Sequence, residues 1–202
     1  MKGYGDFVKA VITADLRDNF FNDDFFCMPK ILLPILGKPL ISYIIDILSF
    51  YGTNEIVLLL EAPSEKISEY LNGSSDCGVK IRPIVGKSIN DAFNSFLNSN
   101  EETDDDLILI NDNVLFDFDL TEAEKYHRSV GADITVLTSH YDRTSGERLV
   151  FTSPSGKITG FSGSVGRGSL LTDKADTGIY IISRKILKML HGSAISNFSN
   201  DI

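Results

Sequence analysis

The residues best suited to chemistry follow two short apolar runs of the chain. Residues 14–40, ADLRDNFFNDDFFCMPKILLPILGKPL, begin with acids and phenylalanines and end in an apolar run closed by GKPL. Asp112 stands in INDNVLFDFDL, where LILI gives way to polar residues. A carboxylate at such a strand tip could hold Mg²⁺ that bridges phosphates, or it could simply cap a turn of the loop. Spacing alone leaves both interpretations of Asp112 open.

The composition of the chain indicates the class of protein to which it belongs. The chain has 202 residues, 43% of them apolar and 23% charged, which is typical of one globular domain with a single core. The net charge of −9 argues against nucleic acid and anionic membrane surfaces as partners. The longest apolar run is interrupted by charges and prolines, so no membrane span is expected. We expect Cys27 and Cys77 to be free thiols, which favours a cytoplasmic location.

Short β-branched runs alternate with helical patterns along the chain, as in βαβ units. Strands are predicted over 7–14, 55–60, 79–85, 107–110 and 134–139, then a hairpin around SPSG and a strand at TGIYIIS. Helices are predicted over 39–51, 64–71, 89–97 and 184–190, and from a capping box of Thr121 with Glu124 to Gly131. The expected fold is α/β, a Rossmann-like open, mostly parallel mixed sheet with helices on both faces. We expect one domain over 1–202, truncated at its C-terminal end.

Three segments, in this order and at this spacing, resemble the sugar-1-phosphate nucleotidylyltransferases, which have the nucleotide-diphospho-sugar transferase fold. They are PKILLPILGKPLISYIIDILSFYGTNEIVLLL, LILINDNVLFDFDLTEAEKYHRSVGADITVL and DTGIYIISRKILKML. The resemblance implies Mg²⁺ as cofactor and attack of a sugar phosphate on the α-phosphate of a nucleoside triphosphate. It also implies that Lys30 neutralises phosphate charge, and that Asp112, with Asp201, holds the metal.

The phosphate loop of that family, G-G-x-G-T-R-L, is not kept here. Its positions hold Asp15, Leu16, Arg17, Asp18, Asn19 and Phe20. Side chains block the close approach of backbone N–H groups to phosphates that glycines allow. At ~5 Å and an effective dielectric near 20, each added carboxylate opposes a triphosphate by about 3 kcal/mol, roughly a hundredfold in affinity. This loop therefore predicts a site that no longer binds nucleotide.

Other family positions are also altered. Only Gly86 is recognisable of the G-T-A type loop, Ser162-Gly163-Ser164 replaces E-K-P, and Asp176-Thr177 replaces N-A. A retained fold with a dismantled site is similar to the gamma and epsilon subunits of eukaryotic translation initiation factor two-B. Our main hypothesis is therefore a catalytically degenerate structural or regulatory subunit of that guanine-nucleotide exchange complex. Its partners would be other subunits, and no cofactor is expected.

Two alternatives remain open from the sequence. The first is an active, divergent sugar-1-phosphate nucleotidylyltransferase, with Lys30, Asp112, Asp201 and Mg²⁺ in the roles given above. The second is a module that senses a nucleotide or sugar phosphate without turnover. His127, His140 and His191 are expected to be solvated or packing residues, and GSVGRGS (163–169) a loop. The phenylalanines at 20, 21, 25 and 26 could fill the core or form a partner surface.

Overall fold

The computed structural model describes residues 9–16, 28–73, 78–99, 105–111, 114–141, 148–162 and 172–190. The chain forms two compact units. Unit 1 consists of residues 1–135 and 181–202, and unit 2 of residues 136–180. The expected single domain over 1–202 stays a prediction. Within the described ranges, no helix has the length and apolar character that a bilayer crossing needs.

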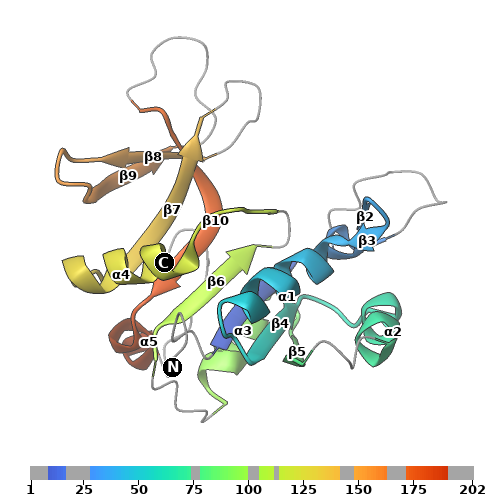
Figure 1. The fold of residues 1–202 in the computed structure, drawn as a ribbon. Helices are drawn as coiled ribbons and strands as arrows, with labels where there is room; N and C mark the ends of the chain where they lie inside the picture. Colours follow the sequence, from blue (N-terminus) through green and yellow to red (C-terminus); the bar gives the residue numbers. More distant parts are fainter. Residues whose placement is uncertain are drawn as a thin grey trace. The chain divides into compact units, whose positions relative to one another are not determined.

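A parallel sheet forms the centre of unit 1 (Figure 1). Its strands lie in the order β5 (Lys80–Val85), β4 (Glu55–Leu60), β1 (Lys9–Ala14) and β6 (Leu107–Asn111), and each neighbouring pair is parallel. β4 and β1 are buried after their first residue. This burial explains their continuous apolar sequences, because a strand covered on both faces needs no alternation of polar residues. The predicted α/β class with a mostly parallel central sheet is confirmed.

The helices described in unit 1 each bury at least one apolar side chain. They are η1, a 3₁₀ turn (Lys30–Leu32), α1 (Leu40–Phe50), α2 (Glu65–Gly73), α3 (Ile89–Leu97), α4 (Leu120–Val130) and α5 (Arg184–Leu190). In α1 the buried residues recur at helical spacing from Leu40 to Leu48, and in α3 Phe93 and Phe96 are buried. The short strands β2 (Pro34–Ile35) and β3 (Lys38–Pro39) form a hairpin before α1. The two turn residues, Leu36 and Gly37, both have positive φ, as a tight hairpin turn requires.

The start of α4 differs from the predicted capping box. Asp119, not Thr121, caps the helix, because its carboxylate accepts hydrogen bonds from the backbone N–H groups of Thr121 and Glu122. Glu124 is buried, and its Oε1 lies 2.6 Å from Nη2 of Arg128 one turn later. The helix ends at Gly131 in the left-handed conformation, as predicted.

Unit 2 is built from β-strands. They are β8 (Leu149–Thr152), β9 (Ile158–Ser162) and most of β7 (Ile134–His140) and β10 (Lys174–Ile182). β8 pairs with both β9 and β10, and the hairpin of β8 and β9 can be followed in Figure 1. Its turn lies at Ser153–Gly156, which confirms the predicted SPSG hairpin. Tyr141, Leu149 and Ala175 form a buried cluster within this unit.

His127 is a packing residue whose burial leads to a prediction. Its ring is almost fully buried, with Nδ1 2.7 Å from Oγ1 of Thr135. Burial lowers the pKa of the imidazole; Arg128 also lowers it, whereas Asp106 and Asp133 oppose the shift. The unfolded chain therefore binds this proton more tightly, so the free energy of unfolding should fall as pH falls below the ordinary histidine pKa of ~6.5.

Urea denaturation at about pH 7.5 and about pH 5.5 checks this expectation. The contribution of His127 is at most about 1.4 kcal/mol per pH unit, the value for one proton. His127→Asn should reduce the pH dependence. Equal slopes for the wild-type chain and His127→Asn would contradict the expectation.

Candidate functional site

The carboxyl ends of β4, β1 and β6 lie side by side at one edge of the sheet in unit 1. In the register of these parallel strands, Ala14 pairs with Leu60, and Thr13 pairs with Asn111. Open α/β sheets bind ligands beyond this edge, because helix N-termini and loops converge there. The described residues at the edge are the first residues after β1, the residue after β4 and the last residue of β6.

Two side chains tie the end of β1 to its neighbours. Oγ1 of Thr13, which is 7% exposed, donates a hydrogen bond to Oδ1 of Asn111 at 3.2 Å. The backbone N–H of Leu16 donates to Oε1 of Glu61 at 2.9 Å, and Glu61 is 6% exposed. The first contact joins β1 to β6, and the second joins the loop after β1 to the end of β4. Neither contact could be predicted from the sequence, because a polar residue at the end of a strand is typical of any loop.

Among the predicted site residues, Lys30 lies within the described ranges, while Asp112 and Asp201 lie outside them. Lys30 is the first residue of η1, and its side chain is half-buried. Ile31 and Leu32 are buried and anchor this turn, which a hydrogen bond from the N–H of Leu32 to the carbonyl of Pro29 closes. The local sequence PKIL therefore places a lysine on a turn fixed by apolar packing.

The residue types at and after the end of β6, Asn111 and Asp112, are ones whose side-chain oxygens can bind a magnesium ion. The described part of the chain holds no group of three or more His, Cys, Asp or Glu side chains that could bind a metal. Asn111, held by Thr13, ends β6, and Asp112 follows it in the sequence. Amide and carboxylate oxygens are the ligands that Mg²⁺ takes in proteins, so this pair of residue types suits that ion.

Gly86 occupies a turn that has no room for a side chain. Its N–H donates to the carbonyl of Leu60 at 2.8 Å, which ties the turn after β5 to the end of β4. A Cβ at this position would lie 2.3 Å from the backbone nitrogen of Ala92 in α3. Ser88 caps α3 between the two, because its Oγ accepts from the N–H of Asp91. Glycine is therefore required here by close backbone approach.

Gly86→Ala should lower the free energy of unfolding by about 3 kcal/mol, because the added methyl group meets backbone atoms that cannot rotate away. Gly73→Ala is the matched control, since a Cβ at Gly73 meets nothing within 4 Å. Urea denaturation of both variants measures the difference. A loss below about 1 kcal/mol for Gly86→Ala would show that α3 shifts at little cost.

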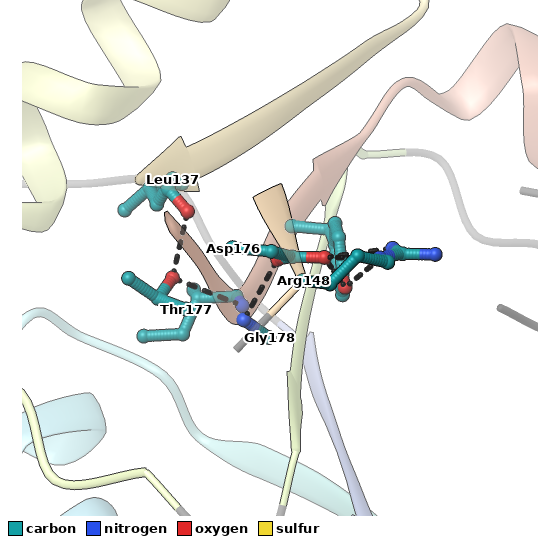
Figure 2. Close-up of polar contacts among 7 residues, drawn as sticks. Leu137, Arg148, Asp176, Thr177 and Gly178 are labelled. Carbon is teal, nitrogen blue, oxygen red and sulfur yellow. Dashed lines mark hydrogen bonds and ion pairs between the residues drawn. The ribbon is translucent and has the colours of Figure 1, made fainter. Parts of the chain in front are cut away.

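In unit 2, the carboxylate of Asp176 is the centre of a buried polar network (Figure 2). Its side chain is 5% exposed, and Oδ2 accepts from Nε and Nη2 of Arg148 at 3.0 and 2.7 Å. Tyr180 donates to the same oxygen at 2.8 Å, and the N–H of Gly178 donates to Oδ1 at 2.9 Å. The guanidinium of Arg148 lies over the ring of Phe161 at 4.2 Å. Burial, followed by the charge of Asp176, raises the pKa of the Tyr180 hydroxyl.

Thr177 is also engaged within unit 2, as Figure 2 shows. Its Oγ1 donates to the carbonyl of Leu137 at 2.8 Å and accepts from the N–H of Ile179 at 3.3 Å. Asp176 and Thr177 stand where the family motif has N-A, and both now hold the irregular part of β10 around Gly178, which has φ of 75°. We interpret this network as a structural anchor, because four donors of the protein already occupy the carboxylate of Asp176.

The chain is similar in sequence to a known protein family and to curated proteins of known name. The family model described as nucleotidyl transferase matches residues 26–199. A UTP–glucose-1-phosphate uridylyltransferase from Synechocystis is 26% identical, covering 96% of this chain and 54% of the relative. A putative mannose-1-phosphate guanyltransferase from Sulfolobus acidocaldarius is 25% identical over 83% of this chain and 46% of its own length. The chain therefore spans about half the length of these relatives.

A solved structure shows the same fold. The crystal structure of a putative glucose-1-phosphate thymidylyltransferase from Bacillus anthracis has a TM-score of 0.76 and 17% identity. The match covers 93% of this chain and 76% of that chain. At this identity the likeness concerns the fold, and it confirms the predicted nucleotide-diphospho-sugar transferase type.

These relatives overturn our main functional hypothesis. The degenerate subunit of an initiation-factor exchange complex is wrong, because the similar curated proteins are named as uridylyl- and guanyltransferases of sugar 1-phosphates. The hypothesis gave the altered family motifs, the phosphate loop above all, too much weight. It placed Asp15 and Asp18 beside a triphosphate from spacing alone, whereas the family match extends over most of the chain.

Proposed function

Since this chain belongs to the nucleotidyl transferase family, whose model matches residues 26–199, we propose that it is a magnesium-dependent sugar-1-phosphate nucleotidylyltransferase. Its substrates would be a nucleoside triphosphate and a sugar 1-phosphate, and its products a nucleoside-diphosphate sugar and pyrophosphate. The named activities of the Synechocystis and Sulfolobus relatives support this reaction class. They differ in base and sugar, so the proposal covers the class and not one substrate pair.

The observation that carries this proposal is the tied edge of β4, β1 and β6. Thr13 holds Asn111, and Glu61 holds Leu16, so hydrogen bonds from two buried side chains organise the ends of three adjacent parallel strands. Where a strand runs into an ordinary exposed loop, water satisfies the backbone N–H and C=O groups, so buried polar side chains are not needed to bind them. An ordered edge at the carboxyl ends is what a nucleotide site of this fold requires.

In the reaction, an oxygen of the sugar phosphate attacks the α-phosphorus of the triphosphate. The bond from that phosphorus to the bridging oxygen of the β-phosphate breaks, and pyrophosphate leaves with the electron pair. Lys30, on the rigid turn η1, would bring its ammonium to the phosphates, where it stabilises the charge that develops in the transition state. Asp112, together with Asp201, would hold Mg²⁺, which neutralises phosphate charge when bound.

The proposal is tested by incubating the full chain with Mg²⁺, each common nucleoside triphosphate and a panel of sugar 1-phosphates. We expect pyrophosphate release that requires both substrates and yields a nucleoside-diphosphate sugar by mass spectrometry. Hydrolysis of the triphosphate without sugar 1-phosphate would not support the proposal. Binding of a triphosphate by calorimetry without any turnover would favour a sensor of nucleotide over an enzyme.

A further inference from the structure

The position of Glu61 calls for a functional explanation. It is the first residue after β4, whose residues Ile56 to Leu60 are all apolar and buried. Its carboxylate is itself buried, at 6% exposure, although it lies at the edge of the sheet. A buried ionised carboxylate is costly unless donors compensate it, and glutamate is seldom fully buried without them. The compensation here comes in part from a neighbouring segment of the chain.

The donor is the backbone N–H of Leu16, at 2.9 Å from Oε1 of Glu61. The parallel register pairs Ala14 with Leu60, so residues 15 and 16 leave β1 beside the point where Glu61 leaves β4. The ladder of hydrogen bonds between the two strands ends there. The hydrogen bond between Glu61 and Leu16 therefore continues the pairing of β4 with β1 beyond the last paired residues of the two strands.

We propose that Glu61 is a positioning residue that holds the backbone of residues 15 and 16, where the chain leaves β1, in the conformation that receives the nucleoside triphosphate. This inference rests on the proposed function. Residues 15 and 16 leave β1 at the edge where the nucleotide would bind, and the side chain of Glu61 accepts a hydrogen bond from their backbone. Glu61 acts through Leu16 and needs no contact with the nucleotide.

The hydrogen bond, and not the negative charge, is the feature that matters in this role. Glutamine keeps an oxygen at the same distance along the side chain, so Glu61→Gln can still accept from the N–H of Leu16. Alanine removes this acceptor from the N–H of Leu16. A charge next to a triphosphate would repel it, so loss of charge alone should not weaken nucleotide binding.

The experiment compares steady-state kinetics of the wild-type chain with Glu61→Ala and Glu61→Gln. We expect Glu61→Ala to raise the KM for the triphosphate about tenfold or more, as for loss of one hydrogen bond to a charged group. The KM for the sugar 1-phosphate should stay within about threefold, and Glu61→Gln should stay within about threefold of wild type for both substrates. Hydrogen exchange at the Leu16 amide should become faster in Glu61→Ala and remain slow in Glu61→Gln.

Glu124→Ala serves as the matched control. Glu124 is also a buried carboxylate of unit 1, but it pairs with Arg128 within α4. The Glu124→Ala substitution should reduce thermal stability without a selective change in the KM for the triphosphate. The inference is overturned if Glu61→Ala leaves that KM within about twofold, or if Glu61→Gln raises it as much as Glu61→Ala. A wild-type chain that neither turns over nor binds a triphosphate would instead remove the proposed function, and this inference with it.

Discussion

Replacing Asp176 with alanine should lower the free energy of unfolding by about 3 kcal/mol, the cost of breaking a buried ion pair. The carboxylate accepts four hydrogen bonds from Arg148, Tyr180 and Gly178. Its removal leaves the guanidinium of Arg148, which is 28% exposed, without this partner in a half-buried place. Urea denaturation, followed by far-ultraviolet circular dichroism, measures the loss.

The control for this prediction is an exposed ion pair. Glu122 and Lys125 lie 2.7 Å apart on α4 and are both about two-thirds exposed, at 68% and 66%. Glu122→Ala should change stability by less than about 1 kcal/mol, as for surface pairs in general. If Asp176→Ala cost no more than Glu122→Ala, the network in unit 2 would not be the anchor that we infer.

Lys30→Ala should reduce kcat/KM by about 10²–10³, the usual effect of removing one group that stabilises transition-state charge. The loss should appear mainly in kcat, because the ammonium interacts most strongly with the charge that develops as pyrophosphate leaves. The fold should survive, since Ile31 and Leu32 supply the packing of η1. Circular dichroism and thermal denaturation of the variant verify this point.

Lys157→Ala is the control for the loss of one positive charge. Lys157 is an exposed lysine of the turn between β8 and β9, and its replacement should leave kcat/KM within about twofold. Equal losses in the two variants would indicate a general electrostatic effect of net charge. An unchanged kcat in Lys30→Ala would show that this lysine has no part in the reaction.

Much of the fold could be predicted from the sequence, because it depends on local patterns of apolar residues. The uninterrupted run at 55–60 and the helical stripe from Leu40 to Leu48 both form the predicted elements. The capping box at Thr121 failed for a physical reason. Glu124 faces the core and pairs with Arg128, so Asp119 caps the helix in its place.

The polar contacts of the candidate site could not be predicted in the same way. Arg148 and Asp176 are 28 positions apart, and they meet because the antiparallel strands β8 and β10 pair Leu149 with Ala175. No local sequence pattern encodes this register. Glu61 and Leu16 are 45 positions apart and meet through a parallel pairing. Spacing along the chain identifies candidate residue types, but the register of the strands decides which of them touch.

The exchange of label between pyrophosphate and nucleoside triphosphate tests the central claim most directly, because it requires nucleotide, metal and sugar-phosphate subsites at once. The full chain would be incubated with Mg²⁺, radiolabelled pyrophosphate and a panel of nucleoside-diphosphate sugars. We predict that label enters the triphosphate only when a matching nucleoside-diphosphate sugar is present, and that Lys30→Ala slows this incorporation. Absence of incorporation with every nucleoside-diphosphate sugar of the panel would contradict the proposed transferase.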